Sequence, residues 1–356
     1  MKKIRVNLRE NSYFIYPGRP LEKLGGAMRG KAYGKKVLLL SDSKVFSIYG
    51  ATVKRVLEES GRDVLDAVIK PGESAKNFKK VYRILEKCAE NRMCRNDTLL
   101  TLGGGVVSDL GGFAASIYMR GINYACVPTT LLAQVDASIG GKTAVNMPSG
   151  KNLIGSFYQP SFVYMDFNTL ATLPEREEKQ GIAEIIKYGV IRNRKIFGIV
   201  RDNDISGMRS LYPALIEKSI MIKKDVVEKD EKETKGLREI LNFGHTLGHA
   251  VEISLFPEMT HGESVALGMV GESYLSWKLG FCKKNVFEAV KETVKKHGLP
   301  FSFAGMDIAK TADFLAFDKK VRDGKIRFVA VKDIGTVKSG VAVEKETVEK
   351  ILKEAG

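Results

Sequence analysis

Three of the four histidines, His245, His249 and His261, fall within one short region of the sequence. His245 and His249 are four residues apart, so on a helix they share one face and both could bind a metal ion. His261 could reach the same position from the next helix. Three protein ligands around an open coordination position are what Lewis-acid catalysis needs, so the pattern indicates a catalytic metal centre. The spacing leaves open which of the first two histidines binds, because a histidine that orients a ligand has the same spacing.

Charged side chains elsewhere could complete this centre. Glu184 lies within an apolar helical segment, and Lys187, three residues later, would point the same way. Arg238 precedes His245 by seven residues, about two turns of a helix, which would bring a guanidinium near the metal. The alternative is that the histidines cap helices or fill the core. The fourth histidine, His297, ends an amphipathic helix and is expected at the surface.

A glycine-rich turn, Gly103 to Gly105, follows an apolar run and leads into a helical segment. Backbone without side chains could approach a pyrophosphate at the helix N-terminus, as in dinucleotide-binding folds. Ser108 replaces the third glycine of the usual fingerprint, and the alternative is a tight turn without functional meaning. Polar residues after other expected strands would lie at the same sheet edge, where an open α/β sheet binds its ligand: Asp42, Gly72, Glu73, Thr129 and Thr130.

A polar and basic run occupies residues 134–152. It contains Asp136, Lys142, Lys151 and Asn152 among several glycines, and Arg120 lies shortly before it. Glycines and fixed cations suit a cradle for a phosphate or carboxylate group. The alternative is a solvated loop.

The elements that must position these residues divide the chain into two halves. Short apolar runs at 37–40, 64–69, 98–102, 124–127 and 162–165 alternate with helical segments, which predicts parallel strands in βαβ units. Long helical periodicities follow at 175–191, 212–227 and 287–297. We therefore predict an α/β Rossmann-like nucleotide-binding domain over 1–173 and a mainly α-helical domain that binds metal and substrate over 174–356. The active site is expected in the cleft between them.

The composition excludes several classes of protein. With 44% hydrophobic and 28% charged residues among 356, the chain is expected to form globular domains. The longest apolar stretches are too short to span a membrane and the start lacks the features of a signal peptide, so a cytoplasmic protein is expected. The net charge is +15, but the basic residues are interleaved with acids, which argues against nucleic-acid binding. The four cysteines form no Cys-x-x-Cys motif and are expected to be reduced.

Over essentially its whole length, the sequence resembles the 3-dehydroquinate synthase family, most specifically at 103–113, 128–155 and 241–249. The resemblance implies a dehydroquinate synthase-like fold and a lyase of the shikimate pathway that converts 3-deoxy-arabino-heptulosonate 7-phosphate to 3-dehydroquinate and phosphate. It implies that NAD takes a hydride from C5 of the substrate, that phosphate then leaves by β-elimination, and that the hydride returns before an intramolecular aldol closes the ring.

The same resemblance assigns roles to residues. It implies that zinc, or cobalt in its place, is held by Glu184, His245 and His261, which leaves His249 as a catalytic or orienting group. The implied NAD contacts are Asp42, Gly72, Glu73, Lys76, Gly105, Val106, Val107, Ser108, Asp109, Thr129, Thr130, Lys142, Lys151, Thr169, Leu170, Ala171 and Thr172. The implied substrate-binding and catalytic residues are Asp136, Lys142, Asn152, Lys187, Lys223, Arg238, Asn242 and His249, with Arg120 reaching in from the partner subunit of a homodimer.

Two lysines are not fixed by the resemblance. Residues 233–238 contain one residue more than the family pattern, so the upstream carboxylate-binding lysine is Lys223 or Lys224, of which we favour Lys223. The late phosphate-binding lysine is Lys319 or Lys320.

Other classes of function fit parts of the pattern. A sugar phosphate cyclase whose substrate lacks a carboxylate is disfavoured by Arg238, since a buried guanidinium without a counter-charge is costly. An NAD- and metal-dependent polyol or glycerol phosphate dehydrogenase is disfavoured by Lys142, Lys151, Asn152 and the motif at 242–249. A non-catalytic binding module is disfavoured because every proposed metal ligand is present.

Overall fold

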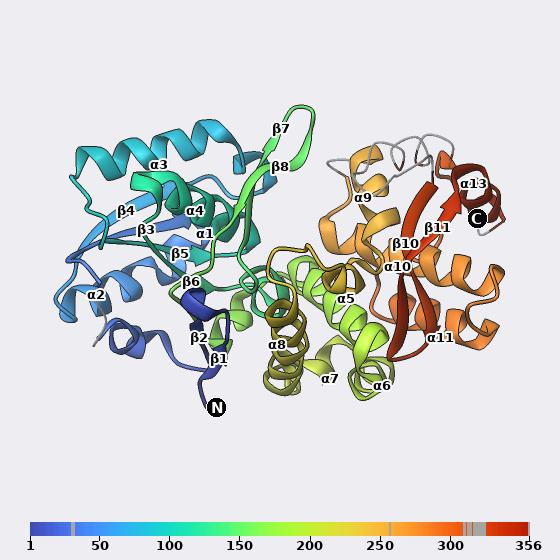
Figure 1. Ribbon diagram of the computed structural model, residues 1–356. Helices are drawn as coiled ribbons and strands as arrows, with labels where there is room; N and C mark the ends of the chain where they lie inside the picture. Colours follow the sequence, from blue (N-terminus) through green and yellow to red (C-terminus); the bar gives the residue numbers. More distant parts are fainter. Residues whose placement is uncertain (30–32, 256–257, 309–310, 312–314, 316–324, 355–356) are drawn as a thin grey trace. The chain divides into compact units, whose positions relative to one another are not determined.

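The chain forms two compact units, Met1–Pro174 and Glu175–Gly356. The computed structural model describes all residues except 30–32, 256–257, 309–310, 312–314, 316–324 and 355–356 (Figure 1). The first unit is an α/β structure built on a mainly parallel sheet, and the second is mainly helical, which confirms the expected fold class. Lys319 and Lys320 lie outside the described residues, so the choice between them stays a prediction.

A seven-stranded sheet forms the centre of the first unit, with the strand order β1-β2-β9-β6-β5-β3-β4. Its strands are β1 (Ile4–Val6), β2 (Tyr13–Pro17), β3 (Lys36–Asp42), β4 (Asp63–Ile69), β5 (Thr98–Gly103), β6 (Asn123–Pro128) and β9 (Phe162–Met165). β1 pairs antiparallel with β2, and the other neighbouring pairs are parallel. The five apolar runs of the sequence form β3, β4, β5, β6 and β9, which confirms the predicted parallel strands. β5 and β9 are buried throughout, as parallel strands covered on both faces should be.

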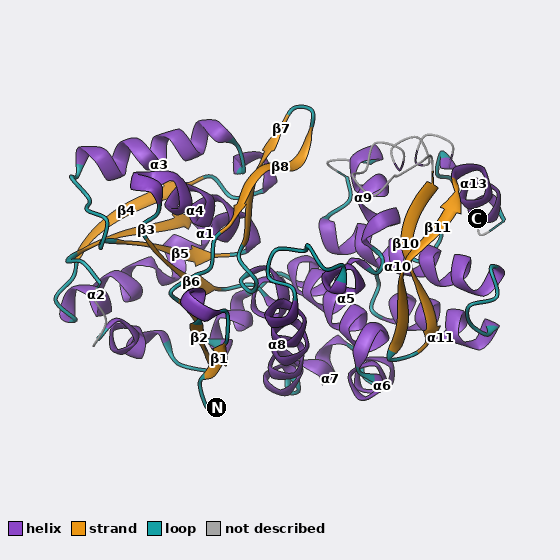
Figure 2. Cartoon of the chain, viewed as in Figure 1, coloured by secondary structure: helices purple, strands orange, loops and turns teal. Residues whose placement is uncertain are grey.

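Helices cover both faces of this sheet (Figure 2). On one face, η2 (Leu21–Met28) and α2 (Ala51–Glu59) form a core with Leu39 and Leu100. On the other, α4 (Gly105–Ile117) packs so closely that a Cβ on Gly111 would lie 2.2 Å from Thr101 Cγ2. The other helical elements described in this unit are η1 (Arg9–Asn11), α1 (Ser43–Val45), η3 (Phe46–Gly50), η4 (Glu73–Ala75), α3 (Phe78–Glu90), η5 (Tyr118–Arg120), η6 (Ala133–Ala137) and η7 (Phe167–Thr172).

A hairpin that the sequence did not predict carries part of the polar and basic run. β7 (Lys142–Met147) and β8 (Gly150–Phe157) pair antiparallel as a separate two-stranded sheet. Few of their side chains are buried, so the hairpin lacks the alternation of apolar and polar residues that would identify strands in the sequence. α4 holds the hairpin, since a Cβ on Gly112 would lie 2.4 Å from Thr143 Cγ2. The alternative prediction of a solvated loop is therefore wrong for residues 142–157 of the run.

The second unit consists mainly of helices. They are α5 (Glu175–Arg192), α6 (Arg194–Asp202), α7 (Ile205–Arg209), α8 (Tyr212–Lys229), η8 (Leu237–Asn242), α9 (His245–Ser254), α10 (His261–Lys278), α11 (Lys284–Lys296) and α13 (Lys345–Lys353). The periodicities at 175–191, 212–227 and 287–297 correspond to α5, α8 and α11, which confirms these predictions. An antiparallel hairpin of β10 (Lys325–Asp333) and β11 (Thr336–Glu344) was not predicted.

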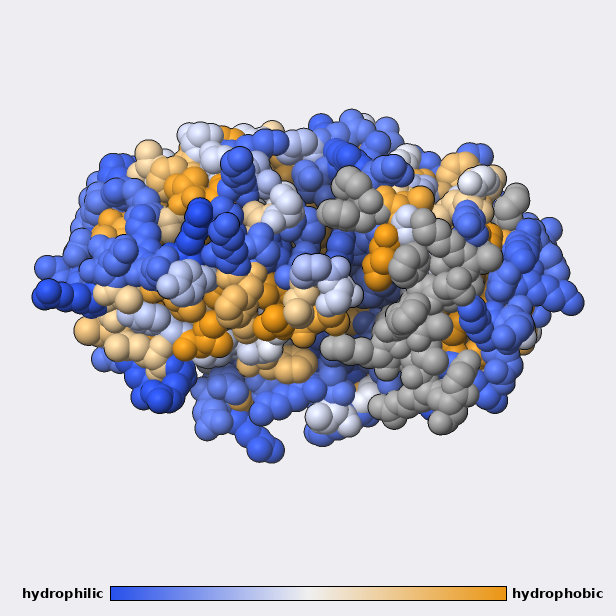
Figure 3. Space-filling view, turned by 90° about the horizontal axis from the view of Figure 1, so that it is seen from above, coloured by the Kyte–Doolittle hydropathy of each residue, from blue (hydrophilic) through white to orange (hydrophobic). Residues whose placement is uncertain are grey.

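On the face that Figure 3 shows, hydrophilic residues predominate and apolar areas lie between them. Among the described residues, no helix is both long enough and apolar enough to cross a membrane.

A buried carboxylate, Glu178, links α5 to α7 and α8 through the exposed Arg209 and the buried Tyr212. Glu178 accepts hydrogen bonds from Arg209 at 2.9 and 2.7 Å and from the Tyr212 hydroxyl at 2.6 Å. Burial raises the pKa of Glu178, but these hydrogen bonds outweigh it and hold the pKa below its usual range. This carboxylate therefore contributes to stability as a charged group.

Replacing Glu178 by alanine is expected to lower the free energy of unfolding by about 2 kcal/mol, because the buried Tyr212 hydroxyl loses its acceptor. The matched control is Glu175→Ala on the same helix, whose exposed pair with Lys179 at 2.8 Å contributes less than about 1 kcal/mol. Urea unfolding of both variants measures the difference. Equal losses in the two variants would contradict a special role for Glu178.

His297 is not at the surface, contrary to expectation. It is 1% exposed, and its Nε2 donates to the Val200 carbonyl at 2.9 Å. Nδ1 is buried and has no hydrogen-bond partner among the described residues. The helix end therefore turns this side chain inward to bind the backbone of α6. Burial lowers the pKa of His297, the Lys296 charge adds to the effect, and the bond to Val200 and the Asp204 charge oppose it.

This burial makes the stability of the protein pH-dependent. The unfolded chain takes up a proton at this imidazole near pH 6.5, where the folded protein keeps it neutral. The unfolded state therefore binds more protons, and the stabilising contribution is lost as the pH falls below that value. Urea midpoints measured from pH 8 to pH 5.5 are expected to fall more steeply for the wild type than for His297→Gln, roughly over one pH unit on either side of 6.5. Parallel curves would contradict the assignment.

Candidate functional site

Glu184, His245 and His261 converge in the second unit. Glu184 comes from the buried part of α5, while His245 and His261 are the first residues of α9 and α10. Glu184 Oε1 lies 3.5 Å from Nε2 of His245 and 3.5 Å from Nε2 of His261. Ligand atoms about 2.1 Å from a tetrahedral zinc ion are roughly 3.4 Å apart, so the spacing has the size of a zinc site.

On each of the two rings, Nδ1 faces an oxygen atom away from Glu184, and Nε2 faces Glu184. His245 Nδ1 lies 3.1 Å from the Phe243 carbonyl oxygen, which can only accept, so Nδ1 carries the proton and Nε2 keeps its lone pair. His261 Nδ1 lies 3.6 Å from Glu252 Oε2. A carboxylate in this position typically orients a metal-binding imidazole. Sequence reasoning missed Glu252, although its place three residues after His249 on a helix was a usable signal.

The Glu184 carboxylate tests whether the set fits a metal ion. The side chain is completely buried, and neither of its oxygens has a hydrogen-bond partner among the described residues. The buried Lys187 forms an ion pair with Oε2, while Oε1 faces the two imidazoles. A buried carboxylate oxygen without a hydrogen bond is costly unless a cation binds it. The residues present therefore fit a divalent metal.

The electrostatics of the two imidazoles differ. Burial lowers the pKa of His245 well below its usual range, and the charge of Lys187 adds to this effect. Burial also opposes charge on His261, but the nearby carboxylates of Glu184 and Glu252 outweigh it and raise the pKa of His261 to about 10. One positive charge is therefore favoured between the two carboxylates, whether a proton or a bound cation supplies it.

His249 lies beside the metal-binding set. Its ring centroid is 5.4 Å from that of His245 and 6.1 Å from that of His261. It also forms a second possible ligand group with Glu252 and His261. Spacing did not distinguish His245 from His249, whereas the structure places His245 against Glu184.

Arg238 is not on the helix of His245, contrary to expectation. η8 ends at Asn242, and Gly244 has a left-handed φ of 78°, so α9 begins only at His245. The seven residues from Arg238 to His245 therefore do not form two turns of one helix, as the spacing predicted. The side chain of Arg238 is nevertheless buried, with 1% exposed, and Nη1 donates to the Glu231 carbonyl at 2.6 Å.

The two candidate lysines of α8 differ in environment. Lys223 is buried, with 6% exposed. Lys224 forms an ion pair with Glu228 at 2.8 Å, one turn along the same helix. The burial favours Lys223 as the cation for a ligand inside the unit.

The carboxyl edge of the sheet in the first unit collects the predicted nucleotide-binding residues. β5 ends at Gly103, and α4 begins at Gly105 with Gly104 as its N-cap, so the helix starts with Gly105, Val106, Val107, Ser108 and Asp109. A Cβ on Gly104 would lie 3.0 Å from Thr130 Cγ2, so the space at this turn is tight. Thr129 Oγ1 is buried and has no hydrogen-bond partner among the described residues. At the end of β3, Asp42 Oδ1 accepts from the amides of Lys44 and Val45 at 2.9 and 3.1 Å.

Lys76 links the glycine-rich turn to the β7–β8 hairpin. It is buried, and its Nζ donates to Asp109 Oδ2 and to Asn152 Oδ1, each at 2.5 Å. Glu73 accepts from Asn146 of the same hairpin at 2.7 Å. The structure thus brings together four predicted residues that lie far apart in the sequence: Glu73, Lys76, Asp109 and Asn152.

Other predicted residues of the first unit belong to η6, η7 and the β7–β8 hairpin, whereas Arg120 lies between the end of α4 and the start of β6, at the opposite edge of the sheet. Asp136 is half-buried in η6, Lys142 is exposed at the start of β7 and Lys151 is half-buried near the start of β8. Arg120 is exposed at the end of η5 with a left-handed φ of 64°. Thr169, Leu170, Ala171 and Thr172 belong to η7, where Thr172 Oγ1 lies 2.7 Å from the Tyr49 hydroxyl.

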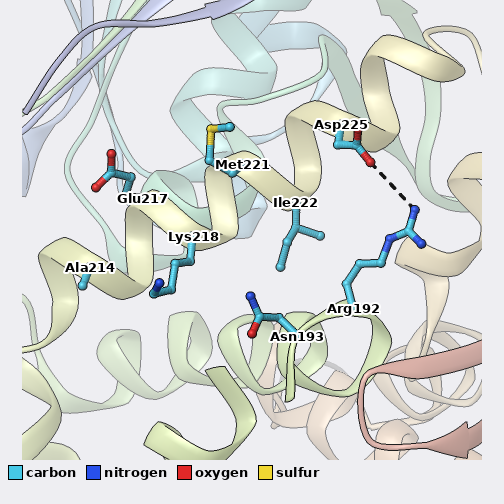
Figure 4. Close-up of a pocket in the computed structure, with 8 residues that line it drawn as sticks. All are labelled: Arg192, Asn193, Ala214, Glu217, Lys218, Met221, Ile222 and Asp225. Atoms are coloured by element: carbon cyan, nitrogen blue, oxygen red, sulfur yellow. Dashed lines mark ion pairs between the residues drawn. The ribbon is translucent and has the colours of Figure 1, made fainter. Parts of the chain in front are cut away.

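A separate pocket of about 510 Å³ lies on the second unit, where α5 meets α8 (Figure 4). Its lining consists of Arg192, Asn193, Ala214, Glu217, Lys218, Met221, Ile222 and Asp225. None of the predicted site residues belongs to it, so this pocket is not the candidate site.

Comparison with known proteins links both units to one family. Residues 66–180 match the description "3-dehydroquinate synthase N-terminal", and residues 181–321 match "3-dehydroquinate synthase C-terminal". The chain is 44% identical to a 3-dehydroquinate synthase of Nostoc punctiforme over 98% of both chains. It is similar to the structure of 2-epi-5-epi-valiolone synthase from Streptomyces hygroscopicus with NAD⁺ and Zn²⁺ bound, with a TM-score of 0.89 and 27% identity over 98% of both chains. It shares its fold with 2-deoxy-scyllo-inosose synthase, solved with carbaglucose-6-phosphate, NAD⁺ and Co²⁺, at a TM-score of 0.90 and 24% identity over 100% of both chains.

Proposed function

The chain belongs to the 3-dehydroquinate synthase family, and we propose from this premise that it converts 3-deoxy-arabino-heptulosonate 7-phosphate to 3-dehydroquinate and phosphate. The observation that carries the site assignment is the convergence of Glu184, His245 and His261 around a buried carboxylate oxygen without a hydrogen bond. These three residues would hold the divalent metal, which we propose to be zinc. When bound, NAD would take up and return a hydride, and the metal would polarise the oxygen on the substrate carbon that is oxidised and then reduced.

Arg238 and Lys223 bind the substrate carboxylate in this proposal. Both are cations buried in the second unit, with 1% and 6% of their surface exposed. A planar guanidinium can bind a carboxylate with two parallel hydrogen bonds. Two buried cations at one site favour a substrate that carries a carboxylate over the substrates of the carboxylate-free cyclases.

The phosphate group is assigned to the β7–β8 hairpin and the residues beside it. Lys142 and Asn152 lie on this hairpin, and Asp136 lies in η6 directly before it. Lys76 holds the Asn152 side chain oxygen, so the Asn152 amide nitrogen is left to donate to a ligand oxygen. Asn242, at the end of η8, is assigned to the substrate as well.

His249 and Lys187 handle protons and orient the substrate. Both lie beside the metal-binding set, since His249 shares the face of His245 and Lys187 pairs with Glu184. The substrate's own phosphate can take the proton that is removed next to the transient ketone. The protein therefore needs few acid and base groups of its own.

NAD is assigned to the carboxyl edge of the sheet in the first unit. The N-terminus of α4 offers unpaired backbone amides to a pyrophosphate, and the side-chain-free turn before it permits close approach. The buried Thr129 hydroxyl, which has no described hydrogen-bond partner, supports a polar ligand at this edge.

We also propose a homodimer in which Arg120 acts on the partner's substrate. Ile117 and Met119 are exposed apolar residues next to Arg120, and Phe157 joins them across the Ser116–Ser156 hydrogen bond of 2.8 Å. Exposed apolar residues grouped in this way favour a protein interface. Mixing inactive Arg120→Ala with inactive Lys142→Ala protein is expected to restore activity that neither has alone, because one site of each mixed dimer is intact. Failure to restore activity in mixtures that sedimentation shows to be dimeric would contradict this arrangement.

The reaction itself is tested by following phosphate release from 3-deoxy-arabino-heptulosonate 7-phosphate with chelator-stripped protein. Phosphate release that requires both NAD and metal, without net NADH, is the expected result. NADH accumulation on a polyol without phosphate release would instead identify a dehydrogenase.

A further inference from the structure

The segment 230–247 carries three residues of the proposed site on irregular backbone. Arg238 and Asn242 lie in a short 3-10 helix, and His245 follows a left-handed Gly244. Glu233 and Gly236 also have positive φ, at 55° and 72°. Such backbone cannot satisfy its own N–H groups, which therefore need acceptors elsewhere.

Asp230 binds the start of this segment. Its Oδ1 accepts from the amides of Thr234 at 2.9 Å and Lys235 at 3.1 Å. Its Oδ2 accepts from the amides of Leu237 at 3.0 Å and Arg238 at 3.3 Å. The side chain is buried, with 1% of the residue exposed. One carboxylate thus fixes the loop and the backbone of Arg238 itself.

Glu272 binds the end of the segment. Its Oε2 accepts from the Gly244 amide at 2.9 Å, and its Oε1 accepts from the amides of Thr246 at 3.0 Å and Leu247 at 3.3 Å. The residue is completely buried. A negatively charged carboxylate at the N-terminus of α9 also interacts favourably with the positive end of the helix dipole.

Glu272 and His261 lie on the same helix, α10, so Glu272 ties the start of α9, where His245 lies, to the body of the helix that begins with His261. The contact is close, since a Cβ on Gly268 would lie 1.9 Å from the Gly244 carbonyl oxygen. The close contact between Gly268 and Gly244 and the three hydrogen bonds of Glu272 therefore determine where His245 lies relative to α10, the helix of His261. Neither Asp230 nor Glu272 points to substrate or metal chemistry in the sequence.

We infer that Asp230 and Glu272 are positioning residues that hold the two ends of this segment, Asp230 setting the place of Arg238 and Glu272 that of His245. The inference rests on the proposed function of these two side chains. The two residues are therefore expected to have different effects. Loss of Glu272 weakens metal binding, and loss of Asp230 weakens substrate binding.

The experiment compares Glu272→Gln and Asp230→Asn, which keep the size of each side chain and place an amide N–H against backbone donors. Zinc affinity is measured by chelator competition and the Co²⁺ absorption spectrum, and KM by phosphate release at saturating metal. Glu272→Gln is expected to weaken zinc binding by roughly tenfold or more and to alter the Co²⁺ spectrum, with KM little changed. Asp230→Asn is expected to raise KM by roughly tenfold, with zinc affinity and the Co²⁺ spectrum unchanged.

Glu178→Gln is the matched control, because it converts a buried carboxylate of the same unit that lies outside the segment. It should lower the melting temperature and leave both readouts unchanged. If zinc affinity and KM change together in both variants, or follow the melting temperature alone, the inference is wrong. If Glu272→Gln does not fold, hydrogen exchange of peptide 243–248 in the wild type decides instead: protection is expected, and fast exchange would overturn the inference. A wild type that binds zinc but releases no phosphate would refute the proposed function and leave the Glu272 result valid.

Discussion

Replacing Glu184 by glutamine is expected to lower turnover by roughly 10³-fold or more and to abolish tight metal binding. Glu184 is completely buried, and its Oε1 is the atom that both imidazoles face at 3.5 Å. Glutamine has nearly the same shape but lacks the negative charge that binds a divalent cation. If the metal contributes about 4 kcal/mol of transition-state stabilisation, its loss accounts for a rate change of this size.

Metal content by atomic absorption and the steady-state rate with added zinc test this prediction together. Glu178→Gln, on the same helix, is the control for the general effect of losing a buried carboxylate, and it should retain metal and turnover. A Glu184→Gln protein that binds zinc as tightly as the wild type would contradict the assignment of this residue. Retained turnover without metal would contradict the role of the metal itself.

Replacing Arg238 by methionine is expected to lower kcat/KM for the carboxylate substrate by roughly 10²- to 10³-fold. Truncating one partner of a buried charge pair costs about 2 to 5 kcal/mol, and this guanidinium is only 1% exposed. Methionine preserves much of the side-chain length and removes the charge. Because Arg238 is assigned to the substrate carboxylate and not to the metal, zinc affinity should stay unchanged.

The measurement compares kcat/KM and zinc affinity in Arg238→Met and in Arg192→Met. Arg192 belongs to the same unit but is exposed, and its ion pair with Asp225 is long at 3.8 Å, so its replacement should leave kcat/KM unchanged. A loss of zinc affinity in Arg238→Met that matches the loss of activity would contradict the substrate-binding role. It would indicate that the replacement disturbs His245 through the backbone.

The fold class was predictable because the parallel strands are buried on both faces and have a distinctive composition. β5 and β9 consist of residues that are all buried, so their apolar runs stand out from the helices between them. The β7–β8 hairpin was not predictable in this way. Neither of its faces is fully buried, and its residues have the mixture of glycine, lysine and asparagine that a loop also has.

The wrong expectations share a physical cause, which is that local spacing does not report tertiary contacts. His297 has the sequence position of an exposed helix end, but the carbonyl of Val200, on a helix far away in sequence, accepts its hydrogen bond. Arg238 has a helical spacing to His245, but Gly244 interrupts the helix because α10 passes too close for a side chain.

The sequence by itself determined the α/β and helical halves, the glycine-rich turn after β5 and the identity of the residues able to bind a metal. Residue type and short-range periodicity carry this information, since they set which groups can ligate and which segments form strands or helices. Only the tertiary structure decided that His245 rather than His249 faces Glu184, and that Glu252, Asp230 and Glu272 support the site. The physical reason is that a carboxylate's role depends on which N–H groups or imidazoles the packing of other helices brings within reach of its oxygens.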